Sequence, residues 1–400
     1  MIRVFSHHFQ VSTLLLTALN AICLGLVVLS GYFLLNPANG TALLTTVPGA
    51  IAVALATLAV LARFSFNHTT SPIITRRILV LGVGRDATMV KEALDKARVR
   101  GHSVVGFYSI DADQHVDAAL PANKILPPSK SIVEIARQHN VSEIVLAMRE
   151  RRGGSLPLTD LLNCKLQGIK VTDLSAFYEQ YHSKVRIDLL RESWFIFGDG
   201  FRQHTARLLV KRVFDILASG ALLVLSLPVM LLAAIAIKLE SAGPVIYRQE
   251  RVGLGGKSFD VLKFRSMCAD AEKDGKPQWA QAGDARVTRV GRFMRLTRID
   301  ELPQLFTVLA GQMSLVGPRP ERPYFVDQLV QQIPFYGARH SVKPGVTGWA
   351  QVRHHYGASV DDASDKLQYD LYYVKNHTLF FDILVLFYSV RVVLFAQGSR

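Results

Sequence analysis

Cysteine is scarce in this sequence of 400 residues. The three cysteines, Cys23, Cys164 and Cys268, form no CxxC pair and suggest no disulfide framework, which is typical of a reducing, cytoplasmic interior. Acidic residues are also outnumbered, because 32 aspartates and glutamates stand against 46 lysines and arginines, a formal net charge of +14. Such a basic chain suits anionic lipid or phosphate-bearing substrates. Nucleic acid is disfavoured as a partner, since no nucleic-acid-binding motif is present.

Long apolar runs, by contrast, are abundant, and half of all residues are hydrophobic. Residues 11–35 and 43–61 are each long enough to cross a bilayer as a helix. Basic residues precede and follow this pair of runs, so the positive-inside rule places both ends in the cytoplasm. We therefore predict a transmembrane helical hairpin over residues 1–64, with a cleavable signal peptide as the alternative.

Residues 65–174 alternate between strand-like and helix-like segments, which predicts a Rossmann-like α/β domain. The spacing Gly82-Val-Gly84-Arg-Asp-Ala87 nearly fits the dinucleotide-binding fingerprint, and Asp111 lies near where a ribose-binding acid is expected. Gly82, Gly84 and Asp111 are therefore candidates for nucleotide binding. The alternative is a domain with this fold and no cofactor.

The third apolar run, residues 216–237, differs in kind because Ser226 and Pro228 interrupt its middle. A proline inside a helix kinks it and frees the carbonyl four residues back, here that of Val224, which Ser226 is expected to help satisfy. Basic residues flank both ends, and a full span would put the rest of the chain outside the cell. We therefore expect a kinked re-entrant helix over residues 211–238, which enters and leaves on the cytoplasmic face; a plain span is the alternative.

The most informative stretch is residues 286–350. Five arginines recur there at every third position, and then Asp300 and Glu301 stand side by side at the start of an apolar helical run. Pro303 suits the first turn of a helix and Gly311 its end. Asp300 is thus expected at or next to a helix N-terminus, where the dipole keeps a carboxylate ionised and favours phosphate nearby. An ordinary N-cap aspartate and a solvated arginine face are the alternatives.

Two turn motifs follow the acidic pair, Gly317-Pro-Arg-Pro and Pro344-Gly-Val-Thr-Gly. Together with the Asp300-Glu301 block, with Lys-Arg-Val-Phe-Asp at 211–215 and with Lys-Phe-Arg-Ser-Met at 263–267, they resemble the bacterial polyprenyl-phosphate sugar-1-phosphate transferases, which are monotopic phosphoglycosyl transferases. The resemblance covers residues 211–373 closely and the Rossmann-like part loosely, and it points to the long form of the exopolysaccharide branch. Long members usually carry four or more N-terminal spans, whereas this sequence shows two.

The resemblance implies a membrane α/β protein made of a helical hairpin (1–64), a Rossmann-like domain (65–174), a linker (175–206) and a catalytic sugar-phosphate transferase domain (207–400). It implies that a sugar-1-phosphate passes from a UDP-sugar to undecaprenyl phosphate, with release of UMP, which starts the synthesis of an exopolysaccharide or another surface glycan. Asp300 would be the nucleophile of a covalent aspartyl-phosphosugar intermediate, and Glu301 would help it to hold Mg²⁺.

The resemblance also assigns phosphate-binding residues and residues of the re-entrant helix. The phosphate-binding set is Lys263, Arg265, Arg289, Arg295 and Arg319. The set on the re-entrant helix is Arg212, Asp215, Ser226 and Pro228. We further expect a homodimer in the bacterial inner membrane, in contact with membrane lipid, with its catalytic domain on the cytoplasmic face.

Two other functions fit parts of the sequence. A membrane-anchored, NAD-dependent nucleotide-sugar dehydratase or epimerase would use residues 82–87, but such enzymes usually need a Tyr-x-x-x-Lys pair, which is absent here, so NAD is not favoured. A nucleotide-sensing membrane scaffold would turn over nothing. Nucleotide release separates the three, because the transferase alone yields UMP.

Overall fold

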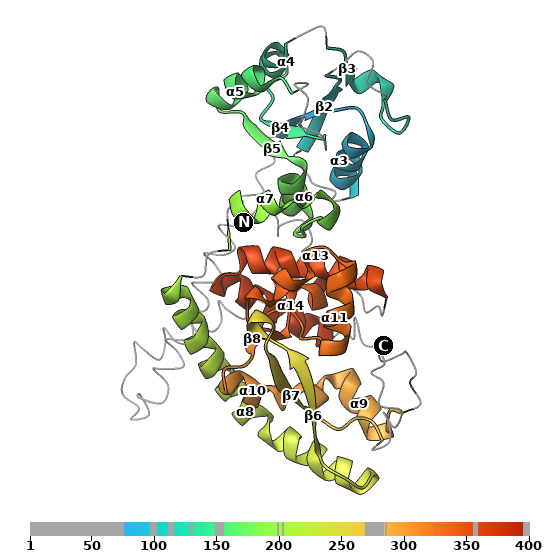
Figure 1. Ribbon diagram of the computed structural model, residues 1–400, viewed down its shortest axis with the longest axis vertical. Helices are drawn as coiled ribbons and strands as arrows, with labels where there is room; N and C mark the ends of the chain where they lie inside the picture. The colour runs from blue at the N-terminus through green and yellow to red at the C-terminus, as the bar shows by residue number, and fades with distance from the viewer. Residues whose placement is uncertain are drawn as a thin grey trace, which may run out of the picture. The chain divides into compact units, whose positions relative to one another are not determined.

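The computed structural model describes residues 76–96, 102–110, 116–128, 131–148, 156–197, 200–201, 204–268, 284, 286–354 and 359–394. The predicted hairpin and the candidate Asp111 lie outside the described residues. The chain divides into two compact units, of which unit 1 ends at Ser183 and unit 2 begins at Lys184. Figure 1 labels many of the helices and strands of both units.

Unit 1 is built on a parallel five-stranded sheet in the order β3-β2-β1-β4-β5. Its strands are β1 (Arg76–Leu81), β2 (His102–Tyr108), β3 (Ile125–Leu126), β4 (Glu143–Leu146) and β5 (Lys170–Asp173). Its helices are α3 (Arg85–Lys96), the 3₁₀ turn η2 (Ala122–Lys124), α4 (Ile132–Gln138), α5 (Leu158–Leu166) and α6 (Leu174–His182). The predicted alternation of strands and helices is confirmed, and α6 extends unit 1 into the predicted linker because its Phe177 is fully buried.

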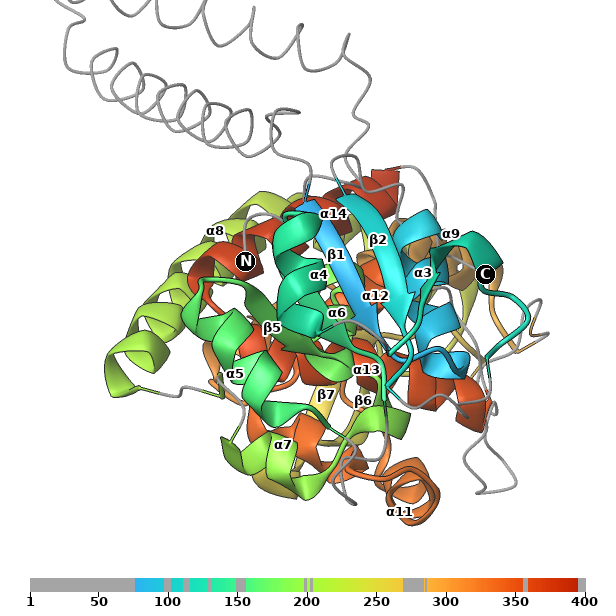
Figure 2. The ribbon, with the colours of Figure 1, turned by 90° about the horizontal axis from the view of Figure 1, so that it is seen from above.

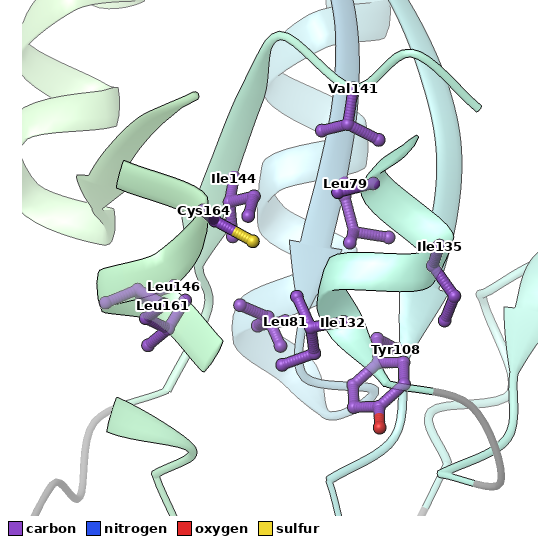
Figure 3. Packing of buried hydrophobic residues seen from close by; sticks show 11 residues of the cluster. Leu79, Leu81, Tyr108, Ile132, Ile135, Val141, Ile144, Leu146, Leu161 and Cys164 are labelled. Atoms are coloured by element: carbon purple, nitrogen blue, oxygen red, sulfur yellow. The ribbon is translucent and has the colours of Figure 1, made fainter. Parts of the chain in front are cut away.

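Helices cover both faces of this sheet, which explains why β1 is a continuous apolar run rather than an alternating one. Leu79 and Leu81 face α4 and α5, where they pack with Ile132 and Leu161 (Figure 3). Figure 2 shows α4 and α5 on one side of β1 and β2 and α3 on the other. Gly82 then turns the chain out of β1 with φ 121°, and a Cβ there would lie 2.6 Å from the Ala147 carbonyl oxygen, so only glycine fits.

Unit 2 combines one long helix, α8 (Thr205–Glu240), which is exposed along much of its length, with shorter helices and two pairs of strands. The strands are the antiparallel pair β6 (Ile246–Val252) and β7 (Ser258–Phe264), and the parallel pair β8 (Ser314–Val316) and β9 (Gly345–Thr347). The other α-helices are α7 (Glu192–Phe197), α9 (Arg289–Thr297), α10 (Gln304–Leu309), α11 (Pro323–Gln332), α12 (Trp349–Arg353), α13 (Val360–Asn376) and α14 (Leu379–Leu394). The described residues of unit 2 also form the 3₁₀ turns η3 (Ile187–Leu189), η4 (Leu254–Gly256), η5 (Ile299–Glu301) and η6 (Tyr336–Ser341).

Among the described residues, α8 is the one helix long and apolar enough to cross a membrane. Its middle exposes large apolar side chains, such as Val224 and Leu225, which are more than 70% accessible. Its C-terminal part packs into unit 2, where Met230 and Ile237 join a cluster with Phe264 of β7. Figure 1 shows the ribbon of α8 changing direction along its length beside α10 and β7.

The hydroxyl of Ser226 does not serve the carbonyl that Pro228 frees, so that expectation is wrong. Ser226 Oγ donates instead to the carbonyl of Leu223, at 3.2 Å. The reason is geometric, because a serine in a helix reaches carbonyls three or four residues back, and Val224 is only two residues back.

Candidate functional site

An acidic pair and several cations meet at η5, directly after α9. Arg298 ends α9 in a left-handed conformation (φ 59°), which reverses the chain and carries Asp300 and Glu301 into the interior. Asp300 and Glu301 are each only 9% exposed. A pair of acids buried this deeply requires compensating charge nearby.

Glu301 receives that compensation directly. Its Oε1 accepts a hydrogen bond from Arg319 Nη2 at 2.9 Å and lies 3.7 Å from Arg298 Nη1. Burial alone would raise the pKa of Glu301, but the charges of Arg319, Lys263 and Arg298 together lower it to about 2. Glu301 is therefore ionised at any physiological pH.

Asp300 is different, although it is the next residue in the chain. Its Oδ1 is buried and accepts no hydrogen bond from any described residue. Burial, followed by the negative charge of Glu301, raises the pKa of Asp300 to about 6, against the opposing charges of Lys263, Arg295 and Arg298. Asp300 lies within η5, just before α10 begins at Gln304, which agrees with its predicted place next to a helix N-terminus. Its pKa is nevertheless raised, because burial is the largest influence on this carboxyl.

Two cations reach the acidic pair from other elements. Lys263 lies on β7, and burial together with the nearby charge of Arg319 lowers the pKa of its ammonium to about 8, while Glu301 opposes that effect. Arg295 projects from α9, and its Nε donates to Ser266 Oγ at 2.9 Å, which fixes the direction of its guanidinium. The structure thus brings together Lys263 and Arg295, as predicted, on two segments that are far apart in sequence.

Arg319 approaches the pair from the Gly317–Pro320 turn after β8. That turn packs tightly against the segment before β9, because a Cβ on Gly317 would lie 2.3 Å from the carbonyl oxygen of Lys343. The guanidinium of Arg319 therefore extends from a closely held backbone to Glu301.

Two of the predicted phosphate-binding arginines lie outside this cluster. The buried guanidinium of Arg265 donates to the carbonyls of Ser241 and Ala242, each at 2.7 Å, at the C-terminus of α8. Arg289 is exposed at the start of α9, where its backbone N–H donates to Glu240 Oε1 at 2.7 Å. The side chain of Arg265 and the backbone of Arg289 therefore help to join α8 to its neighbours, which periodic spacing alone does not reveal.

The residues predicted at the entry of α8 are structural ties as well. Arg212 donates to the carbonyls of Val308 and Leu309 at 2.6 and 2.7 Å, and so provides hydrogen-bond donors for the carbonyl groups at the C-terminus of α10. Asp215 is 2% exposed, and its Oδ1 accepts hydrogen bonds from Ser314 Oγ and the N–H of Leu315, both at 3.1 Å. These contacts hold the N-terminal part of α8 against α10 and β8.

Sequence reasoning does not single out Arg298 and Ser266, yet both belong to the cluster. Arg298 pairs with Glu301, and Ser266 holds Arg295. Arg298 is the last of the regularly spaced arginines and Ser266 lies between Arg265 and Met267 in a predicted motif, so proximity to known candidates was the available signal. In unit 1, Gly82 and Gly84 form the turn between β1 and α3.

The two carboxylates at η5 fit one kind of magnesium site, in which a phosphate substrate supplies part of the coordination. Among the described residues, no group of three or more His, Cys, Asp and Glu side chains lies together. The adjacent carboxylates of Asp300 and Glu301, one with an unpartnered buried oxygen, are what the protein offers. Magnesium is commonly bound through one or two carboxylates and completed by substrate phosphates and water, so the pair suits a site shared with a phosphate substrate.

Comparison with known proteins places this cluster inside a matched region. The model of the family described as bacterial sugar transferase matches residues 206–396. The chain is 47% identical over 240 residues to a UDP-N-acetylgalactosamine-undecaprenyl-phosphate N-acetylgalactosaminephosphotransferase from Aeromonas hydrophila, a match that covers 60% of this chain and 56% of that protein. It therefore spans little more than half the length of that relative.

Two glucose-1-phosphate transferases are also similar. A UDP-glucose:undecaprenyl-phosphate glucose-1-phosphate transferase from Caulobacter vibrioides is 47% identical over 193 residues, which cover 47% of this chain and 71% of that protein. A protein of the same name from Klebsiella pneumoniae is 32% identical over 325 residues, which cover 79% of this chain and 67% of that protein. The longer match extends beyond unit 2 into the first half of the chain.

Proposed function

Because the chain belongs to the bacterial sugar transferase family, the polyprenyl-phosphate sugar-1-phosphate transferases, we propose that it transfers a sugar-1-phosphate from a UDP-sugar to undecaprenyl phosphate and releases UMP. One observation carries the proposal. Asp300 presents a buried carboxylate oxygen without a hydrogen-bond partner, beside a second carboxylate that arginines already occupy. An unpartnered, partly desolvated carboxylate among cations is suited to attack phosphorus.

In the first step, a carboxylate oxygen of Asp300 attacks the phosphorus that bears the sugar. A bond forms between this oxygen and phosphorus, and the bond from phosphorus to the bridging oxygen breaks, so that UMP leaves with the electron pair. With a pKa of about 6, Asp300 is mostly ionised at neutral pH and remains less stabilised than Glu301. Glu301 keeps its arginine partners and does not compete as the nucleophile.

Cations around the pair reduce the repulsion between the carboxylate and the diphosphate. Lys263, Arg295 and Arg319 would contact phosphate oxygens and stabilise the charge that develops in the transition state. A magnesium ion held by Asp300 and Glu301 would add charge neutralisation at the diphosphate.

In the second step, a phosphate oxygen of undecaprenyl phosphate attacks the same phosphorus. The bond from phosphorus to Asp300 breaks, the carboxylate is restored, and the lipid diphosphate sugar leaves. The same cations serve both steps because the reacting phosphorus keeps its place. The dehydratase or epimerase alternative has no support, since each relative named above is a phosphotransferase.

We further propose that α8 is the re-entrant helix and seats unit 2 on the cytoplasmic face of the inner membrane. Both ends of α8 contact the same compact unit, through Arg212 and Asp215 at one end and through Glu240 and Ser241 at the other. A helix crossing the bilayer would separate its ends by about 30 Å of hydrocarbon, and its far end could not bind the same domain. The exposed apolar middle of α8 supports its burial in lipid.

For the rest of the chain we propose a transmembrane hairpin over residues 1–64 and a Rossmann-like domain over residues 65–174. The parallel sheet order β3-β2-β1-β4-β5 supports the second, since it matches five strands of the doubly wound arrangement. The catalytic domain would then comprise residues 207–400, and the preceding residues 175–206 are divided between the two compact units at Ser183.

The proposal is tested by incubating the purified full-length protein with undecaprenyl phosphate, Mg²⁺ and a panel of UDP-sugars. UMP release and the lipid product are measured for the wild type, for Asp300→Asn and for the control Asp327→Asn, which changes an exposed aspartate of α11. We expect Asp300→Asn to lower turnover at least about a thousandfold and to abolish the sugar-phosphate adduct in intact-protein mass spectrometry, with the control unchanged. An active Asp300→Asn variant would contradict the mechanism.

A further inference from the structure

The backbone around Arg319 is held in place by hydrogen bonds to its carbonyl groups. Four consecutive carbonyl groups, from Pro318 to Glu321, each accept a hydrogen bond from another segment of unit 2. The donors, in the same order, are the N–H of Gly345 at 3.0 Å, Arg339 Nη2 at 2.8 Å, Arg251 Nη1 at 3.0 Å and the N–H of Val252 at 2.9 Å. The carbonyl of Arg319 itself is thus bound by a charged side chain.

Arg339 is a buried part of η6, and its guanidinium is 6% exposed. Its Nη2 forms an ion pair with Asp370 Oδ2 of α13 at 2.8 Å, and the same nitrogen donates to the Arg319 carbonyl. Its Nη1 donates to Tyr336 Oη at 2.5 Å. The guanidinium is therefore clamped from two sides and directs one nitrogen at the backbone of Arg319.

A buried ion pair of this kind is a poor way to stabilise a fold, because the cost of removing two charges from water offsets much of their attraction. The pair also leaves Asp370 Oδ1 and Arg339 Nε buried without hydrogen-bond partners among the described residues. An apolar filling of the same volume would avoid both costs. The position of the Arg339 guanidinium therefore calls for a role beyond packing.

We propose that Asp370 and Arg339 form a positioning pair for Arg319, which sets the direction of its guanidinium toward Glu301 and the substrate phosphates. The inference rests on the proposed function and adds two residues to it that touch neither substrate nor the reacting atoms. Arg319 extends from its backbone to Glu301 Oε1, so a displaced backbone moves the guanidinium away from the site where charge develops. Rate depends steeply on such placement, since misplacement by about 1 Å can cost a hundredfold.

Arg339→Lys tests this role, because lysine keeps the charge but has a single nitrogen in place of the three of the guanidinium and cannot make the contacts of Nη1 and Nη2 together. Tyr336→Phe removes one hydroxyl partner of the same guanidinium and tests it more gently. Asp370→Asn removes the charge of the partner, and Asp365→Asn on the exposed face of the same helix is its matched control. Each variant is first checked for folding by size-exclusion chromatography and thermal unfolding, and UMP release by the folded protein then gives kcat and KM.

We expect Arg339→Lys and Asp370→Asn to lower kcat on the order of tenfold, with the KM for the UDP-sugar within about twofold of the wild type. Tyr336→Phe should lower kcat by about threefold and Asp365→Asn should leave it unchanged. In an Arg319→Ala background, Arg339→Lys should have an effect below about twofold, because the residue through which it acts is gone.

A structural role gives a different pattern. If Arg339→Lys lowers kcat by the same factor with and without Arg319, or if folded Arg339→Lys and Tyr336→Phe both keep full kcat, the positioning role is overturned. The proposed function fails separately, if the wild type releases no UMP from any UDP-sugar, and the positioning role then fails with it. Full UMP release by the wild type together with unaffected variants refutes the positioning role alone.

Discussion

Asp300→Asn should make the protein more stable at neutral pH, although it removes the proposed nucleophile. The folded protein raises the pKa of Asp300 from 3.8 to about 6, with burial as the largest cause. Because the folded state holds the proton more tightly than the unfolded state, the stability from this group is complete below about pH 4 and is lost as the pH rises through about 6. At 1.36 kcal/mol per pH unit, ionisation of Asp300 costs the folded state about 3 kcal/mol above pH 6.

Asparagine has a similar shape and does not ionise, so the variant avoids this cost. For a unit of this size, about 3 kcal/mol corresponds to a rise in Tm of about 6–12 °C. Thermal unfolding of the protein in nanodiscs at pH 7.5 and pH 4 measures the difference. A chelator is present throughout, because a bound divalent cation would favour the ionised carboxylate and hide the effect.

An unfavourable buried charge at position 300 predicts different effects of the substitution at the two pH values. Asp300→Asn should gain several degrees at pH 7.5 and almost nothing at pH 4, where the wild-type carboxyl is already neutral. The exposed control Asp327→Asn should change Tm by less than about 1 °C at either pH. An equal or lower Tm for Asp300→Asn at pH 7.5, or the same gain at both pH values, would refute burial of an unfavourable charge at this position.

Three further predictions concern the site and α8. The kcat/KM of the wild type should follow a bell-shaped pH profile, rising near pH 6 as Asp300 ionises and falling near pH 8 as Lys263 loses its proton. An active Lys263→Arg variant should lack the fall near pH 8. Arg265→Ala should destabilise unit 2 by about 2–4 kcal/mol in denaturant unfolding, because the hydrogen bonds to the carbonyls of residues 241 and 242 are lost. Its KM should be unchanged, and a wild-type stability would contradict the structural role. In a cysteine-free background, Leu208→Cys and Leu239→Cys should both resist a membrane-impermeant thiol reagent in spheroplasts and react after lysis, whereas a plain span would expose one of them from outside.

The elements of the chain could be predicted because they depend on neighbours in sequence. The apolar run of residues 216–237, the adjacency of Asp300 and Glu301 and the turn at Gly317–Pro320 are local patterns, and the backbone preferences of their residues largely set the local structure. The same holds for the alternation of strands and helices in unit 1. Motif order also sufficed to recognise the family, since many short elements had to match in sequence.

Which of the basic residues lie near the acidic pair could not be predicted in this way. Lys263, Arg265, Arg289 and Arg295 are similar in charge and lie in similar surroundings along the chain, yet only Lys263 and Arg295 reach the acidic pair. Which of them does so depends on how β7, a distant segment, packs against η5, and on the turn at Arg298 that folds η5 back onto α9. A three-residue spacing says which arginines share a helix and nothing about what faces that helix.

The positions of the helices, turns and acidic residues, and hence the family, follow from the order of residues along the chain. Folding is needed to explain why arginines hold Glu301 while Asp300 keeps an unpartnered oxygen and a raised pKa, and why both ends of α8 contact one unit. The physical reason is that desolvation and charge pairing arise from atoms brought together by folding. Two adjacent carboxylates with the same local sequence can therefore acquire opposite shifts in pKa.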